Sequence, residues 1–200
     1  MKNRWLAVAA LAGLGATAVL AADPSPAIII YVDCDSSIPG APVSLATARS
    51  AKIFAQIGLT VRFRDGRKPK TKMTGAKEFE MYLENELPPD VHAAAVAHLY
   101  GLDGRIRVFY GSLKDYKSGG LLAVVLAYVM THEITHVLEG ISHHSPTGVM
   151  KAKWSREDFA NIEASRLKFD PQDIDLIRSG IEKRESDARE AGLNRTPSGR

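Results

Sequence analysis

The apolar run LLAVVLAYVM at residues 121–130 restricts the fold of this 200-residue chain more than any other stretch. It carries no charge, yet it is too short to cross a membrane, because a spanning helix needs about 20 apolar residues. A helix that is apolar on all sides is buried in a protein core. The run leads straight into THEITH at residues 131–136, so the histidines there stand on a well-supported element. Precise functional sites need such rigid placement.

His132 and His136 have the spacing of a shared metal site. In a helix, residues four apart differ by about 40° in direction and by about 6 Å along the axis, so both imidazoles project to one side. Glu133 is turned about 100° from His132, close to such a metal but free to act as a base on its water. HEITH therefore has the H-E-x-x-H pattern, which is typical of zinc metalloproteases.

A catalytic zinc site takes three protein ligands and leaves one position for water, so a third ligand is needed. The candidates are Glu139, His143, His144, Glu157 and Glu163. Glu139 is nearly in line with His132 but two helical turns further on, so we expect it to lie beyond reach. Gly140 favours the left-handed conformation that ends a helix, and His143 and His144 follow in the returning loop.

The stretch from Thr131 to Trp154 resembles the active-site region of the metzincins, zinc endopeptidases with the motif H-E-x-x-H-x-x-G-x-x-H and a methionine turn. Gly140 comes eight residues after His132 and His144 comes twelve after it, so the turn is longer than in that motif. The order HSPTGVM resembles the matrixin branch, in which serine follows the third histidine. The stretch is also similar to small exported bacterial proteins with H-E-I-x-H-x-x-x-G-x-x-x-H-S-x-x-G-x-M and a tryptophan four residues later.

This resemblance implies an α+β fold of zincin or metzincin type. Such a fold has a mixed sheet with packed helices, a buried active-site helix and a small C-terminal helical lobe. The resemblance also implies that Zn2+ is held by His132, His136 and His144, with His143 as the alternative third ligand.

The resemblance further implies that Glu133 is the general base and that Met150 forms the turn beneath the metal. From the residues alone, without the resemblance, Met150 is better interpreted as a core methionine. The expected activity is hydrolysis of a peptide or protein substrate. We expect the substrate to lie extended, paired with a strand edge near residues 105–111.

Three alternatives remain at this point. A gluzincin-type site would take its third ligand from SREDFANIEASRL, through Glu157 or Glu163. The altered glycine spacing is compatible with a zinc-binding or interaction protein that does not turn over substrate. The rest of the chain has no distinctive motif, so an interaction module that uses no metal is the third alternative.

The rest of the chain predicts an α/β layering. Strands are expected at residues 27–32, 59–64, 78–87 and 105–111, and helices at 44–58, at 88–101 and from about Pro171. His92 and His98 lie in the second of these helices at a spacing that does not share a face, so both are interpreted as structural or surface residues. Asp170 and Asp173 are expected to cap the final helix. We predict one catalytic domain over 23–182, with lobes at about 27–140 and 141–182, and a disordered tail over 183–200.

The first 22 residues have the layout of a secretory signal peptide, with cleavage expected after Ala21 or Ala22 and export to the periplasm or medium. An uncleaved anchor is the alternative, although no stable membrane anchor is expected.

Cleavage removes two cationic residues and no acidic one, so the formal net charge falls from +3 to +1 and gives no support for nucleic-acid binding. The basic run at 62–72 is interpreted as a solvated turn. The lone Cys34 rules out an intrachain disulfide and is expected to be a partly buried thiol.

Overall fold

The computed structural model of the protein describes residues 27–69, 77–89, 95–100, 103–116 and 120–193. The described strands are β1 (Ile28–Cys34), β2 (Val61–Asp65), β3 (Glu78–Glu84), β4 (Ala95–Tyr100) and β5 (Asp103–Phe109). They form one sheet in the order β2-β1-β3-β5-β4. Neighbouring strands run parallel, except that β4 pairs antiparallel with β5. The sheet is therefore mixed, as predicted.

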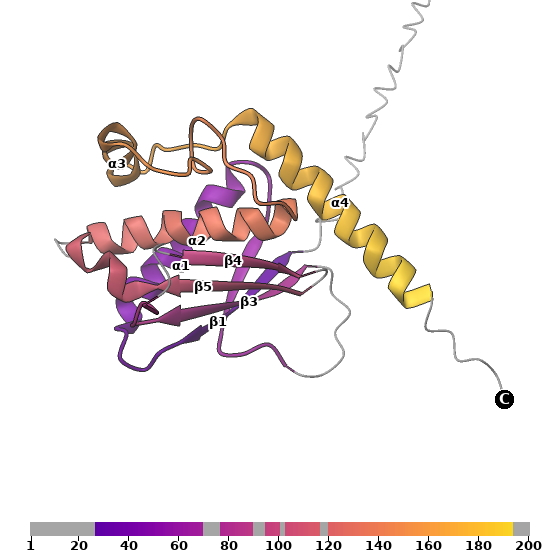
Figure 1. Cartoon of the computed structure of the whole chain (residues 1–200), viewed down its shortest axis with the longest axis horizontal. Helices are drawn as coiled ribbons and strands as arrows, with labels where there is room; N and C mark the ends of the chain where they lie inside the picture. Colours follow the sequence, from indigo (N-terminus) through magenta and orange to yellow (C-terminus); the bar gives the residue numbers. More distant parts are fainter. Residues whose placement is uncertain (1–26, 70–76, 90–94, 101–102, 117–119, 194–200) are drawn as a thin grey trace, which may run out of the picture.

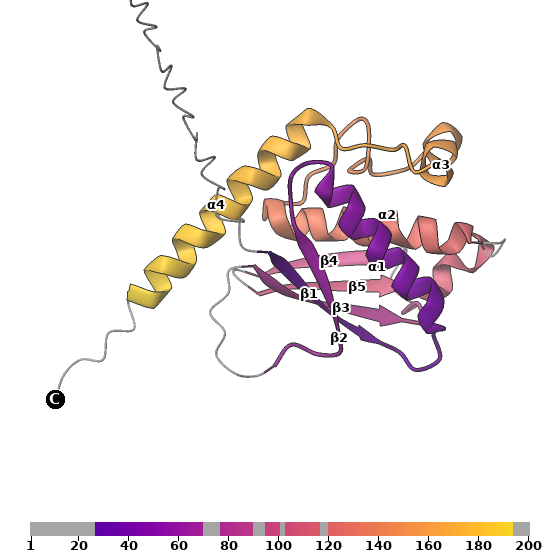
Figure 2. The ribbon, with the colours of Figure 1, turned by 180° about the vertical axis from the view of Figure 1, so that it is seen from behind.

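Two helices cover one face of this sheet. They are α1 (Gly40–Ala55) and α2 (Leu121–Glu139), which lie side by side in Figures 1 and 2. Alternate strand residues face them, because successive side chains of a strand point to opposite faces. The buried set on the central strands is Ile28, Ile30, Val32, Phe79, Met81, Leu83, Ile106 and Val108. The hydrophobic core therefore lies between the sheet and α2.

Helix α2 confirms the prediction of a buried core helix. Every residue from Ala123 to Glu139 is buried, including both histidines of HEITH. Among the described residues, α2 alone has the length and composition of a membrane span, but most of it is buried inside the protein. Gly140 ends the helix with φ +72°, and its N–H donates to the His136 carbonyl at 3.0 Å, as the sequence indicates.

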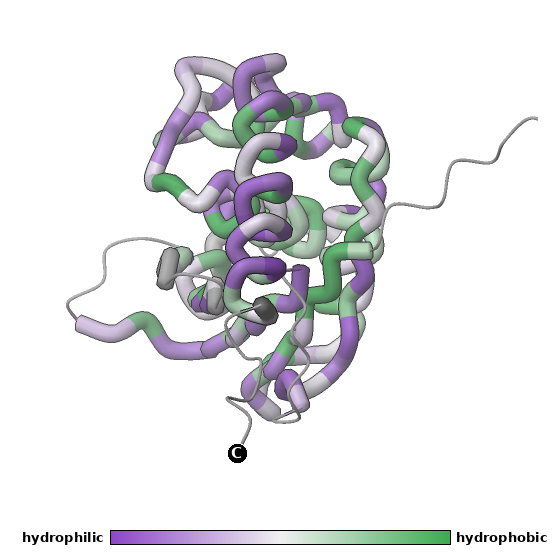
Figure 3. Tube along the Cα trace, turned by 90° about the vertical axis from the view of Figure 1, so that its right-hand side faces the viewer, coloured by the Kyte–Doolittle hydropathy of each residue, from purple (hydrophilic) through white to green (hydrophobic). Residues whose placement is uncertain are grey.

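Two further helices pack on α2 beyond the sheet. Helix α3 (Arg156–Glu163) lies away from the sheet, and α4 (Pro171–Leu193) crosses the end of α2 (Figure 1). A 3₁₀ helix, η1 (Tyr110–Tyr116), follows β5 in the chain and precedes α2. In Figure 3 hydrophobic and hydrophilic residues alternate along α4. Two of its buried residues, Gly180 and Arg184, meet the C-terminal part of α2.

Several predicted elements are confirmed. The order strand, helix, strand at the start of the chain is present as β1, α1 and β2, and residues 78–84 form the predicted strand β3. Gly66 closes the turn after β2 with φ +86°. Cys34 is a free, half-buried thiol, and burial is the main cause that raises its pKa, ahead of the nearby aspartates.

Three predictions need correction. The helix expected over 88–101 is wrong, because Ala95–Tyr100 is strand β4 and its backbone pairs with β5. Strand β4 is thus one edge of the sheet, and residues 105–109, expected at an edge, lie between β3 and β4. His98 lies on β4, whereas His92 lies outside the described residues. The tail predicted from residue 183 is instead helical as far as Leu193. One reason is that Arg184 is buried and donates from Nη2 to the Val137 carbonyl at 2.6 Å.

Candidate metal centre

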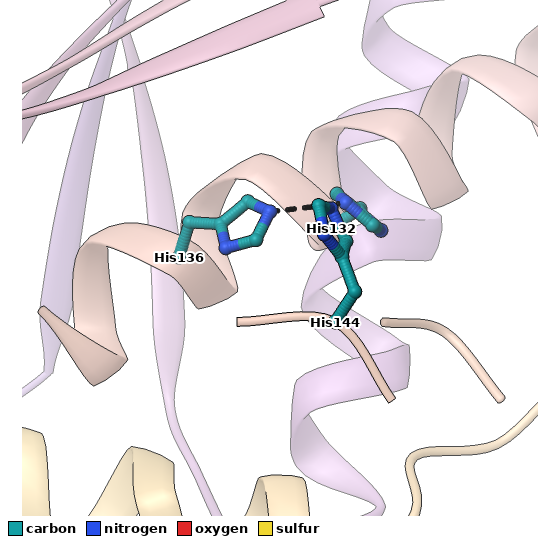
Figure 4. A group of neighbouring side chains, drawn as sticks. All are labelled: His132, His136 and His144. Carbon is teal, nitrogen blue, oxygen red and sulfur yellow. Dashed lines mark hydrogen bonds between the residues drawn. The ribbon is translucent and has the colours of Figure 1, made fainter. Parts of the chain in front are cut away.

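Three histidines from two elements converge on one point (Figure 4). The Nε2 atoms of His132 and His136, both on α2, are 3.1 Å apart. The His144 ring comes from the loop after α2, and its centroid lies 5.3 Å from that of His132 and 4.9 Å from that of His136. One nitrogen from each histidine lies within 4.8 Å of the other two. This spacing suits three ligands of a single metal ion.

The orientation of the His132 ring is fixed by a hydrogen bond at Nδ1, the nitrogen that does not face His136. Its Nδ1 lies 2.8 Å from the Val149 carbonyl oxygen, which can only accept, so Nδ1 carries the proton and donates. This tautomer leaves Nε2 with a lone pair directed toward the other two rings. Trp154 donates from Nε1 to the same carbonyl at 3.3 Å, and its ring lies edge-on to His132 with centroids 6.0 Å apart. Trp154 therefore supports the His132 ring directly.

The loop from His144 to Met150 is closed by its own backbone. Ser145 N–H donates to the Met150 carbonyl at 3.0 Å, and Gly148 turns the chain with φ +76°. Met150 has no exposed surface and belongs to the hydrophobic core. Residues 144–150 thus form a tight turn anchored in the core, at the position where the sequence predicts a methionine turn.

Among the described residues, the other candidate ligands lie outside the three-histidine group. His143 points elsewhere, with its Nε2 3.4 Å from the Ser145 hydroxyl oxygen. Glu157 and Glu163 are exposed on α3. Glu139 is buried one helical turn beyond His136. The geometry therefore brings together His144, and neither His143 nor a glutamate, with the two histidines of α2.

Burial sets the charge of the site. Together with a smaller contribution from the neighbouring histidines, it lowers the pKa of His132 and of His136 to about 4. The two imidazoles are therefore neutral near pH 7, which is the form that binds a metal. Burial also raises the pKa of Glu133 to about 7, against a lowering contribution from the backbone of Ala97. Glu133 is thus poised to gain and release a proton near neutral pH.

This donor set fits zinc. Three imidazole nitrogens leave a fourth position free in a tetrahedral site, as in catalytic zinc sites of the three-histidine kind. Helix α2 also carries Glu133, whose pKa is raised to about 7. Softer thiolate ligands are absent from the group, because the single cysteine, Cys34, lies at the end of β1.

Sequence reasoning did not find several supporting groups. The Val149 carbonyl and the Ala97 backbone carry no side-chain signal, so no pattern of residue types reveals them. Ser145 and Asp173 form a hydrogen bond between a loop and a helix across 28 residues, which no helical or strand periodicity indicates. In the sequence, only the family resemblance singles out Trp154.

No family model and no curated protein matches the sequence. Among solved structures, the fold is similar to that of a zinc-dependent peptidase from Methanocorpusculum labreanum, with a TM-score of 0.52, 16% identity, and coverage of 74% of this chain and 99% of that chain. An archaemetzincin from Methanopyrus kandleri is matched with a TM-score of 0.49 and 14% identity, over 78% of this chain and 96% of that one. The first similarity shows that this chain has the α+β fold of a zinc peptidase.

Proposed function

We propose that this protein is a zinc-dependent endopeptidase of metzincin type. The observation that carries the proposal is the convergence of three imidazole nitrogens within 4.8 Å of one another. His132, His136 and His144 are the proposed ligands. The similarity in fold to a zinc-dependent peptidase supports the same class of chemistry.

In this mechanism, bound zinc supplies a Lewis acid that polarises the scissile carbonyl and lowers the pKa of the attacking water. Glu133 accepts the proton of that water and delivers it to the leaving amine. Both transfers need a group whose pKa lies near the working pH, and burial raises that of Glu133 to about 7. Strand β4 is the sheet edge nearest this glutamate, so we propose that an extended peptide substrate lies along it.

Replacing Glu133 tests the proposed base. We expect Glu133→Ala to keep one zinc per chain and to lose at least about a hundredfold in peptide hydrolysis, the size of typical acid–base contributions. Zinc content and cleavage of a broad peptide library measure the two properties separately. Glu157→Ala, an exposed change on α3, is the matched control and should leave both unchanged. Full activity in Glu133→Ala would show that the mechanism is wrong.

A zinc-binding protein without turnover is the second candidate. The lengthened turn before His144 and the exposure of that ring favour it, since a catalytic ligand is usually held tightly. One zinc per chain with no cleavage of the library would select this alternative. An interaction module without metal would instead bind no zinc.

We also propose that the mature protein acts outside the cytoplasm. The basis is the leader-like sequence at residues 1–22, which lies outside the described part of the structure. N-terminal sequencing of the exported protein should find a start at Ala22 or Asp23. A mature chain that still begins at Met1 in the membrane fraction would support the anchor alternative.

A further inference from the structure

His144, the third histidine, lies on a loop. Helix α2 positions His132 and His136, but His144 needs support from other contacts. His144 is exposed, but the next residue, Ser145, is only 4% exposed. Ser145 N–H donates to the Met150 carbonyl, and the Ser145 hydroxyl donates to Asp173 Oδ1 on α4. The residue joined directly to His144 is thus fixed to a different helix by its side chain.

Asp173 uses both of its carboxylate oxygens. Its side chain has no exposed surface, and Oδ2 accepts from the backbone N–H of Asp170 at 3.2 Å. This second bond is the cap of α4 that the sequence predicts. The first turn of a helix favours a negative charge, and a buried carboxylate is stable only when it is hydrogen-bonded. One carboxylate therefore ties the start of α4 to the loop that carries His144.

The same two segments meet at further points. Thr147 donates from its hydroxyl to Asp170 Oδ2 at 2.7 Å, although this bond is exposed to solvent. Val149 N–H donates to the Lys168 carbonyl at 3.0 Å. Gly148 lies so close that an added Cβ would be 2.4 Å from that same carbonyl oxygen. The Ser145–Asp173 bond is thus a buried member of a set, and it is the one adjacent to the third histidine.

We propose that Asp173 is a positioning residue, which acts through the Ser145 hydroxyl to hold the His144 imidazole toward His132 and His136. The inference rests on the proposed function, because positioning matters only where the three histidines bind zinc. His143 supports the same hydroxyl from its other side, with Nε2 3.4 Å away. His143 then supports the site and is not one of its metal ligands.

The alternative is that Asp173 only caps α4. Capping needs the Asp173 carboxylate and the Asp170 N–H, but it does not need the Ser145 hydroxyl. Ser145→Ala therefore removes the proposed link and leaves the cap intact. Ser145→Thr keeps a hydroxyl, and Asp173→Asn keeps an oxygen for the cap. Thr147→Val removes the exposed bond to Asp170 and serves as the matched control.

Zinc affinity is measured by competition with a chromophoric chelator, and Co2+ absorption reports the ligand geometry. We expect Ser145→Ala and Asp173→Asn to weaken zinc binding by about 10- to 100-fold, as is typical of groups that orient metal ligands. Their Co2+ spectra should also change. Ser145→Thr should restore most of the affinity, and Thr147→Val should change it by less than about threefold. Affinity and spectra in Ser145→Ala that equal those of the wild type would overturn the inference.

Amide hydrogen exchange in the metal-free protein separates this inference from the proposed function. If the wild type bound no zinc, the proposed function would fail, but the link would still be judged by exchange at residues 145–150. We expect Ser145→Ala to speed exchange there while the exchange of α4 stays close to wild type. Unchanged exchange at these residues would overturn the link whatever the zinc result.

Discussion

The pKa values of His132, Glu133 and His136 are shifted mainly by one cause, which is the loss of contact with water. The same buried environment lowers the pKa of the α2 histidines and raises that of Glu133. Neutral ligands and a base near neutrality therefore have one physical cause. A substitution that opened this part of the core to water would shift all three groups toward their ordinary values.

Glu139 is the clearest case of an acid stabilised in its neutral form. It is buried, and among the described residues neither of its carboxyl oxygens has a hydrogen-bond partner. Burial is the main cause that raises its pKa to about 8, and the nearby Asp173 adds to it. In the unfolded chain the carboxyl titrates near its ordinary value of 4.5. The folded state thus holds a proton that the unfolded state has already lost between these two pH values.

This difference predicts the pH dependence of stability in the metal-free protein. The contribution of neutral Glu139 is fully present below about pH 4.5 and is lost as the pH rises through about 8. Glu139→Gln has no proton to lose, so it should gain stability relative to wild type between pH 5 and 9, by on the order of a few kcal/mol. Urea unfolding at both pH values measures the gain. A constant difference between the two proteins across this range would contradict the prediction.

At the scale of elements, the packing of α4 on α2 supports the metal centre. Gly180 sits where the helices cross, and an added Cβ would lie 2.1 Å from the Leu138 carbonyl oxygen and 2.8 Å from that of Glu139. Only a glycine lets the two backbones approach this closely. Because α4 also carries Asp173, its distance from α2 affects the loop that bears the third histidine.

Gly180→Ala is therefore expected to destabilise the protein. Overpacking of this kind costs about 1–3 kcal/mol, and here the contacted atoms are backbone atoms that cannot rotate away. Gly192→Ala, on the same helix with nothing within 4 Å of the added atom, is the matched control. It should be neutral or stabilise by up to about 1 kcal/mol, since alanine favours helix. Equal melting temperatures for the two variants would contradict the proposed close contact.

Local sequence patterns predict those elements whose structure is determined by their own residues and not by contacts with distant segments. The apolar run before HEITH fixes α2 as a core helix, and helical geometry alone brings His132 and His136 together. AVAHLY at 95–100 suits a helix by composition, but pairing with β5 makes it a strand, and this pairing depends on residues elsewhere in the chain. The charged end of α4 lacks a strong apolar stripe. It is held by contacts such as the Lys77–Glu185 ion pair at 2.5 Å, which no local pattern reveals.

The third ligand marks the limit of prediction at the site. The spacing alone does not decide whether His143 or His144 is the third ligand. Only the family resemblance favours His144. The hydrogen bonds that separate them join distant segments, so they follow from the assembled fold. Ser145 lies against Asp173 only because α4 crosses α2 at Gly180.

At the scale of the whole molecule, the sheet with α1 and α2 forms a rigid support, and the loop with α3 and α4 lies on the other side of α2 (Figure 1). The proposed metal joins these two parts, with two ligands on α2 and one on the loop. Zinc should therefore stabilise the entire fold, because it binds the native state only. The division into two lobes at about residue 140 stays a prediction.

Zinc content in purified mature wild type, His143→Ala and His144→Ala tests the central claim most directly. Thermal melting with and without a chelator accompanies it. We expect one zinc per chain in the wild type and in His143→Ala, with a melting temperature that falls when zinc is removed. His144→Ala should lose both the zinc and this difference in melting temperature. A wild type without zinc, or loss of zinc in His143→Ala with retention in His144→Ala, would contradict the account.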